Sequence, residues 1–187
     1  MKYLSKKEPN EEQNMWIDIL HSCVTQRTFN QNLGGLSYVF RNMIAKYVSS
    51  ENHYYVTEGV AKIIDGNEEL QHQIDKDLPI NIKKYFYGKH HPTLLEHMVP
   101  AAVVADELIK AKSPGISREM VKEILINAGS VAIMCRDEDA KMNHHSYKLK
   151  SRMPPEWRYG DSVLARYETA GIKLSSYIVR RGKTILR

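Results

Sequence analysis

The chain has 187 residues, of which 42% are hydrophobic and 26% are charged, the balance of a globular domain rather than of a disordered chain. No segment approaches the roughly 18 apolar residues that a membrane-spanning helix needs, and the N-terminal stretch lacks the apolar core of a signal peptide. The two cysteines, Cys23 and Cys135, match no metal-binding spacing. We therefore expect a cytoplasmic protein without a zinc ribbon.

Positive charge is concentrated toward the C-terminus. The net charge is +5, but residues 144–187 carry ten Lys or Arg against three acids, whereas residues 1–143 carry seventeen against nineteen. A basic C-terminal part next to a slightly acidic remainder suits contact with a phosphate backbone.

The first 85 residues carry mainly helical patterns. Apolar residues recur at helical spacing in 15–24 and in 36–48, and a weaker pattern runs from residue 56 to the turn signal at Asp65-Gly66. The polar stretch 67–84 predicts irregular or partly helical structure. We place a soft boundary here, so that 1–85 is a helical region for recognition or dimerisation and 86–187 is a second module.

Beyond residue 85 the pattern changes to short strands and helices. Short extended pieces are expected between Tyr85 and Pro100, because aromatic residues favour strands while Gly and Pro interrupt helices. One helix is predicted after Pro100 and another after Ser117, a candidate N-cap, with Gly129 as its stop. The apolar run SVAIMC (130–135) then predicts a buried strand.

The segment after that strand, RDEDAKMNHH (136–145), has the acid-rich first turn of a helix. A further helix is expected from an N-cap at Asp161, with Val163, Leu164 and Tyr167 facing inward. The last residues, SSYIVRRGKTILR, predict a two-stranded hairpin. The fold class expected is α+β and predominantly helical.

Glu96 and His97 lie side by side between an apolar run and Pro100. A carboxylate that binds a divalent metal and an imidazole that accepts a proton from water are two parts needed to hydrolyse a phosphodiester. Neighbours on an extended backbone point to opposite sides, so both parts are useful only beside a bend. The alternative is a satisfied structural pair.

The segment LLEHMVP (94–100) resembles the first half of the HNH, or His-Me finger, nuclease motif. The resemblance implies a ββα-metal module, in which a two-stranded hairpin precedes a helix that completes the metal site. It implies that His97 is the general base, Glu96 a metal ligand and Asn143 the ligand on the helix. Asp139 competes with Asn143, because residues four apart share a helical face. Oxygen ligands of this kind favour magnesium or manganese.

The sequence departs from that family in two respects. His97 and Asn143 are 46 residues apart, with two predicted helices inserted between them, and the central Asn has only Asn127 as a weak counterpart. An insertion is tolerable because loop-closure entropy grows slowly with length. The resemblance covers at most residues 90–145.

Basic residues after the predicted metal helix are candidates for contact with a phosphate backbone. Trp157 and Tyr159 in the same loop could stack on bases, or Trp157 could lock the loop onto the core. The candidates for nucleic-acid binding are Lys148, Lys150, Arg152, Arg158, Arg180, Arg181 and Lys183.

The function expected is that of a metal-dependent endonuclease acting on duplex DNA rather than RNA, in a restriction or phage-defence setting. A homodimer would match a symmetric duplex site. Two alternatives stay open: a non-catalytic nucleic-acid-binding or regulatory protein that uses the basic C-terminal half, and an inhibitor that binds another protein through its helical faces.

Overall fold

The computed structural model describes residues 8–26, 34–112 and 115–182. Over these ranges the chain is α+β and mainly helical, as the sequence predicts, and it contains a four-stranded mixed sheet. No helix within the described ranges is long and apolar enough to cross a membrane.

The chain forms two compact units, each assembled from three separate segments. The helical unit comprises Met1–Ser50, His97–Gly129 and Ser151–Ala165. The sheet unit comprises Glu51–Glu96, Ser130–Lys150 and Arg166–Arg187. The boundary expected near residue 85 falls inside the sheet unit, so the contacts divide the chain differently from a single cut.

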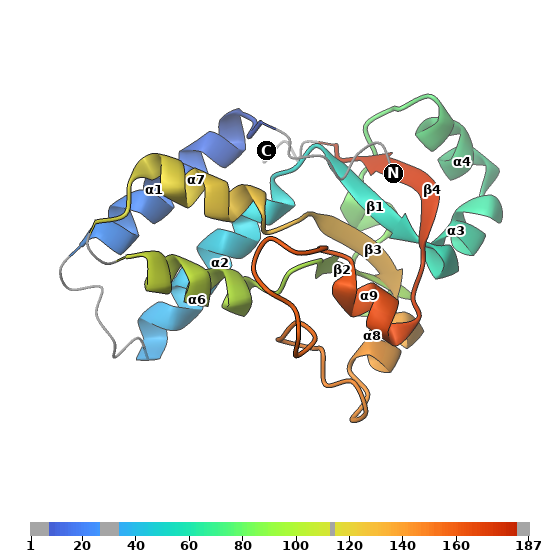
Figure 1. Cartoon of the computed structure of the whole chain (residues 1–187). Helices are drawn as coiled ribbons and strands as arrows, with labels where there is room; N and C mark the ends of the chain where they lie inside the picture. Colours follow the sequence, from blue (N-terminus) through green and yellow to red (C-terminus); the bar gives the residue numbers. More distant parts are fainter. Residues whose placement is uncertain (1–7, 27–33, 113–114, 183–187) are drawn as a thin grey trace. The chain divides into compact units, whose positions relative to one another are not determined.

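In the described part of the helical unit the helices are α1 (Glu11–Thr25), α2 (Gly34–Ser49), α6 (Ala101–Ala111) and α7 (Arg118–Ile126) (Figure 1). Helix α1 packs against α2 and α7, and α6 packs against the same two helices. Each helix contributes apolar residues three or four apart, which gives it one buried face. The core includes Ile17, Leu20, Phe40, Ile44, Leu108, Val121 and Leu125.

Polar side chains fix the ends of these helices. Asn10 caps α1 by accepting a hydrogen bond from the backbone N–H of Gln13, and its amide donates to the Ser50 carbonyl at 2.8 Å. Ser117 caps α7, as predicted, by accepting from the backbone of Met120. Because caps satisfy backbone donors that have no partner within the helix, they fix where each helix begins.

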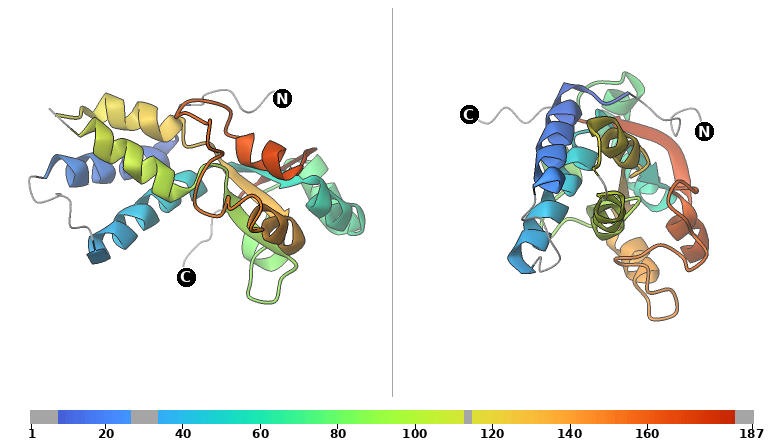
Figure 2. Two further views of the ribbon diagram at one scale, coloured as in Figure 1. Left: turned by 60° about the horizontal axis from the view of Figure 1, so that its bottom comes forward. Right: turned by 60° about the vertical axis from the view of Figure 1, so that its left-hand side comes forward.

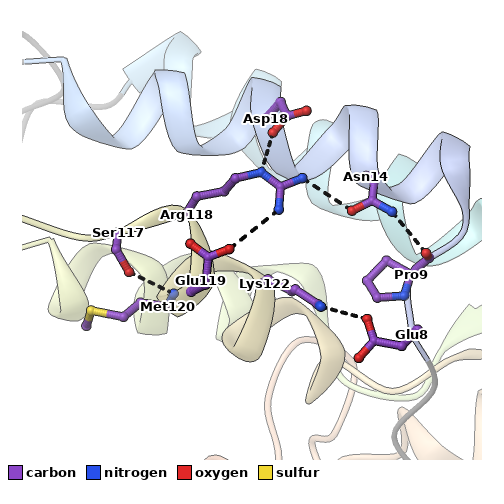
Figure 3. A network of polar contacts seen from close by, with 9 residues as sticks. All are labelled: Glu8, Pro9, Asn14, Asp18, Ser117, Arg118, Glu119, Met120 and Lys122. Atoms are coloured by element: carbon purple, nitrogen blue, oxygen red, sulfur yellow. Dashed lines mark hydrogen bonds and ion pairs between the residues drawn. The ribbon is translucent and has the colours of Figure 1, made fainter.

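Two ion pairs link α7 to the α1 region at the surface (Figure 3). The Nε of Arg118 donates to Asp18 at 2.6 Å, and its Nη2 donates to Asn14 at 3.2 Å. Lys122 binds the carboxylate of Glu8 at 2.6 Å. All these groups are exposed or partly exposed, so water competes for each of them.

The sheet unit is built on four strands in the order β2-β3-β1-β4. They are β1 (His53–Thr57), β2 (Thr93–His97), β3 (Val131–Cys135) and β4 (Leu174–Arg180). Strand β1 pairs in parallel with β3, with Tyr55 opposite Ala132, and antiparallel with β4, with Tyr54 opposite Val179. These three strands run side by side in Figures 1 and 2.

Five short helices complete the sheet unit: α3 (Glu58–Asp65), α4 (Glu68–Asp75), α5 (Ile82–Tyr85), α8 (Arg136–Met142) and α9 (Ala165–Ala170). Helix α3 packs against β1, β3 and β4, α4 packs against β4, and α8 follows β3 directly and contacts it. Apolar side chains at the sheet and under these helices form the core of this unit, including Val56, Val60, Ile64, Phe86, Ile133, Met142 and Val179.

Several local predictions differ from the structure. The helix predicted from an N-cap at Asp161 begins only at Ala165, because the Asp161 carboxylate instead accepts from the backbone N–H of Arg158 at 2.8 Å. The first strand of the predicted C-terminal hairpin is β4, which pairs with β1. Residues 183–187, which would hold the second strand, lie outside the described residues.

The strand, strand and helix expected of a ββα module correspond to β2, β3 and α8. Strands β2 and β3 are neighbours in the sheet, and α8 begins at the residue after β3. They are not a hairpin, because α6 and α7 lie between them along the chain.

Candidate functional site

Glu96 and His97 end strand β2, and their side chains have different partners. The Glu96 carboxylate accepts a hydrogen bond from Arg166 at 2.8 Å, within the sheet unit. The Nε2 of His97 lies 3.2 Å from the Ser49 hydroxyl, within the helical unit. Successive side chains of a strand point to opposite sides, which accounts for the separation.

Arg166 is the buried partner of Glu96. Its side chain is 0% exposed, while that of Glu96 is 21% exposed. The same guanidinium nitrogen also lies 3.4 Å from the carbonyl of Lys150. A buried charge is tolerated only with close partners, so Arg166 requires an anion at the position of Glu96.

Asp139 lies in α8, and Asn143, four residues later, is the C-terminal cap of that helix. The Asn143 amide nitrogen donates to the Asp139 carboxylate at 2.9 Å. This bond fixes the orientation of the amide, because a carboxylate accepts only from the NH₂ group. Among the described residues, the buried Asn143 Oδ1 has no hydrogen-bond partner. Asn143 thus presents an unsatisfied oxygen beside a carboxylate.

The Glu96 carboxyl has charged surroundings. Burial raises the pKa of Glu96 above the usual range of a glutamate, Arg166 opposes this effect, and the Asp139 carboxylate adds to it. The hydrogen bond between Asn143 and Asp139 brings together two of the three residues that the sequence proposes as metal ligands. Glu96 belongs to the same unit, where its direct partner is Arg166.

Tyr167 is a further polar group of this cluster. Its side chain is 1% exposed, and its hydroxyl has no hydrogen-bond partner among the described residues. Burial and then the charge of Glu96 raise its pKa far above the usual value of a tyrosine, with Asp139 contributing in the same direction. An unsatisfied buried hydroxyl is costly unless water or an ion occupies the space beside it.

Glu96, Asp139 and Asn143 carry oxygen atoms of the kind that bind a divalent cation. Two carboxylates and an amide oxygen suit Mg²⁺ or Mn²⁺, and the unsatisfied Asn143 Oδ1 is a ready ligand. Arg166 already neutralises Glu96, and the described residues contain no group of three or more His, Cys, Asp or Glu that could hold a metal. The set fits an ion that is held by Asp139 and Asn143 and otherwise by water, which is a common mode for Mg²⁺.

Glu138 fixes the helix that carries Asp139 and Asn143. Its carboxylate accepts from the Thr57 hydroxyl at 2.5 Å and from the backbone N–H groups of Gly59 at 3.2 Å and Cys135 at 2.9 Å. Gly59 leaves room for this approach, since a Cβ there would lie 2.8 Å from the Glu138 carboxyl carbon and the carboxylate would have to shift. The start of α8 is therefore bound to β1 and α3.

The predicted basic residues are distributed over both units. Lys148 and Lys150 are exposed in the sheet unit, and Lys150 lowers the pKa of Glu96. Arg152 and Arg158 are exposed in the helical unit. The two pairs therefore belong to different units.

Arg180 and Arg181, the described basic residues near the C-terminus, contact other residues of the sheet unit. Arg180 binds the carbonyl of Asp77 at 3.1 Å and lies 3.6 Å from its carboxylate. Arg181 is half-buried and donates its backbone N–H to Asn52 at 2.7 Å. Lys183 lies outside the described residues.

Sequence reasoning missed Arg166 as a site residue and treated Tyr167 only as an inward-facing residue. Neither has a motif around it, and Arg166 lies in an otherwise helical apolar pattern. The sequence feature that could have pointed to Arg166 is its position next to residues that are predicted to face inward. Asn127, the weak counterpart of the central motif Asn, lies in the helical unit, where its amide donates to the Glu123 carbonyl at 3.0 Å.

Comparison with protein-family models, with curated proteins and with solved structures gave no match for this chain. The functional argument therefore depends on the residues themselves.

Proposed function

We propose that the chain is a metal-dependent endonuclease that hydrolyses phosphodiester bonds in nucleic acid, with duplex DNA as the substrate. The observation that carries the proposal is the Asn143 Oδ1, which has no partner among the described residues and is held next to Asp139. Buried oxygens without a protein partner are uncommon in folded proteins, and an ion is one explanation for them.

Each residue of this proposal has a distinct role. Asp139 and Asn143 would hold Mg²⁺ or Mn²⁺, and Glu96 would add negative charge to the site. The bound ion would supply electrophilic stabilisation of the phosphate. Arg166 positions Glu96 through their 2.8 Å contact.

His97 is the proposed general base. Its hydrogen bond with Ser49 at 3.2 Å orients the imidazole ring. An imidazole titrates near neutral pH, so it can accept a proton from an attacking water.

Cleavage of plasmid DNA with and without Mg²⁺ or Mn²⁺ tests the activity. His97→Ala is expected to lower the cleavage rate by at least about 10²-fold, the usual contribution of a general base. His144→Ala, a matched change at an exposed histidine, should leave the rate unchanged. Cutting by the His97 variant at the rate of the unmodified protein would remove His97 from the mechanism.

Metal binding provides a separate readout, by calorimetric titration with Mn²⁺ in the absence of nucleic acid. Asp139→Asn and Asn143→Ala should each weaken binding by about ten-fold or more, as loss of a ligand or its hydrogen-bond partner commonly does. Asp137→Asn is the control, because Asp137 is an exposed carboxylate in the same helical turn. Equal affinity in all three variants would exclude this cluster as the metal site.

The contact between Arg166 and Glu96 favours a second candidate, a non-catalytic nucleic-acid-binding protein. In this case a protein cation already satisfies the carboxylate. Binding would be unaffected by EDTA, would weaken steeply with salt, and would decline when Lys148 and Lys150 are replaced by Ala. Electrophoretic shift assays across a salt series separate the two candidates.

A further inference from the structure

The helical unit contains a groove between α6 and the loop 153–159. It has a volume of about 540 Å³ and combines aromatic, proline and charged walls. We call it the α6 groove, and six of its residues carry the argument: Asp106, Glu107, Lys110, Trp157, Arg158 and Tyr159. Its size lies in the range of small-molecule sites.

The aromatic residues of the α6 groove are held rigidly. The Tyr159 hydroxyl donates to the Ile124 carbonyl at 2.6 Å, and the Trp157 indole donates to the Ser162 carbonyl at 3.0 Å. The two rings meet edge to face with centroids 5.7 Å apart. Because the backbone already satisfies both polar groups, what the rings offer a ligand is apolar surface that loses little freedom on binding.

The charged residues of the α6 groove divide into a paired and an unpaired set. Lys110 contacts Glu107 at 3.4 Å. The Asp106 carboxylate and the Arg158 guanidinium are exposed and have no ion-pair or hydrogen-bond partner within the described parts of the chain. An acceptor and a planar donor are thus available beside aromatic surface.

We propose that the α6 groove binds an unstacked, amino-bearing nucleotide of a single strand, with cytosine as the preferred base. The base stacks on the aromatic wall, its amino group donates to Asp106, and Arg158 contacts the phosphate. This inference rests on the proposed action on nucleic acid. Stacking on aromatic side chains tolerates any base. Selection comes from Asp106, because acidic side chains accept from the cytosine amino group, which thymine lacks.

Fluorescence of Trp157 reports directly on the α6 groove. The chain has two tryptophans, so Trp16→Phe leaves Trp157 as the only one. This replacement removes an indole N–H that is buried without a partner in the described structure. In EDTA, oligo-dC should quench Trp157 and bind about ten-fold more tightly than oligo-dT, the discrimination expected of one specific base contact.

Two variants in the Trp16→Phe background locate the contacts. Asp106→Ala should abolish the preference for oligo-dC, and Arg158→Ala should weaken all oligonucleotides by a similar factor. Asp137→Ala, at an exposed carboxylate of the sheet unit, should change neither. Circular dichroism checks that each variant is folded. Free CMP tests whether a single nucleotide is enough for binding. Quenching of Trp157 by CMP that is lost in the Asp106→Ala variant would support the base contact.

Three outcomes would overturn the proposal: no quenching by any oligonucleotide, equal affinity for oligo-dC and oligo-dT, or equal quenching by heparin, which carries charge without bases. Each measurement is made without metal. Loss of DNA cleavage with intact oligo-dC binding would therefore contradict the nuclease and not the groove, and the reverse result would contradict only the groove.

Discussion

The two units of the chain treat their polar side chains differently. In the helical unit the charged contacts are at the surface, as in the pairs of Arg118 with Asp18 and Lys122 with Glu8. In the sheet unit Arg166 is fully buried against Glu96, and the hydroxyl of the next residue, Tyr167, is buried without a partner among the described residues. Buried polar atoms also occur in the helical unit, at Gln13 and Trp16, but among the described residues the buried charged side chain belongs to the sheet unit.

This difference indicates where a function can be sought. A helix bundle needs no buried charge for stability, and replacing a buried ion pair by apolar residues is often neutral or stabilising. The buried charge of Arg166 is therefore poorly explained by stability alone. We propose that it supports a site that a bound ion or water completes.

Removal of the buried cation should produce the largest effect on stability. Arg166→Met leaves the half-buried Glu96 without its partner and should lower the free energy of unfolding by up to about 3 kcal/mol, the lower end of the range for a broken buried pair. Because burial raises the pKa of Glu96 and loss of Arg166 raises it further, the carboxyl gains a proton as the pH falls, and the defect should shrink. Urea denaturation across a pH series measures both effects.

Two control variants sharpen this comparison between the units. Arg118→Met, a matched change in the helical unit, should cost no more than about 1 kcal/mol. The double variant Glu96→Gln, Arg166→Met should recover part of the loss, since neither buried charge is then left alone. Equal losses for the Arg166 and Arg118 variants would show that the units do not differ in this respect.

A smaller loss is expected where α3 meets Glu138. Gly59→Ala places a methyl group 2.8 Å from the carboxyl carbon of Glu138. Overpacking lowers the free energy of unfolding by about 1–3 kcal/mol. The higher helix propensity of Ala over Gly offsets about 1 kcal/mol of this loss. Gly88→Ala is the control, because nothing lies within 4 Å of a Cβ there. Thermal unfolding measures both, and the idea fails if Gly59→Ala melts no lower than Gly88→Ala.

Loss of the N-cap of α1 should lower the free energy of unfolding by a smaller amount. Asn10→Ala removes the acceptor for the Gln13 backbone N–H and the donor to the Ser50 carbonyl. The expected loss is about 1 kcal/mol, typical of a cap. Asn10→Asp keeps the cap acceptor and should retain more than half of that stability in chemical denaturation. An aspartate variant as unstable as the alanine variant would assign the effect to the Ser50 contact.

The smallest effect should come from the surface pair in the helical unit. Lys122→Ala removes the 2.6 Å contact with Glu8, whose side chain is 83% exposed. The loss should be below about 1 kcal/mol and should vanish in high salt, because counterions screen exposed charges. Unfolding at low and high salt measures it. A loss that persists in high salt would point to packing of the lysine stem instead.

The helices of the helical unit could be predicted because their apolar residues keep a regular period. Strand β1 could not, because four of its five residues are buried and such a run shows no alternation. The stretch 67–84 predicts irregular or partly helical structure, and it holds the short helices α4 and α5; in α4 only Leu70 and Ile74 are buried. Its start instead depends on Asn67, which accepts from the Leu70 backbone.

The candidate site could be predicted only in part. Of the residues chosen from sequence, Asp139 and Asn143 are hydrogen-bonded to each other, while Glu96 contacts Arg166. Arg166 and its contact with Glu96 could not be predicted, since the two are 70 residues apart and only the tertiary fold joins them. The separate partner of His97 also follows from tertiary contacts, which no local pattern encodes.

The alternation of the chain between its units has a consequence for its synthesis. Six successive segments belong in turn to one unit and the other, and Arg166 arrives with the last of them. Neither unit can complete its core until most of the chain has left the ribosome, and non-local contacts of this kind slow folding. No single truncation yields either unit intact, so the nascent chain should depend on protection from aggregation until its final segment is made.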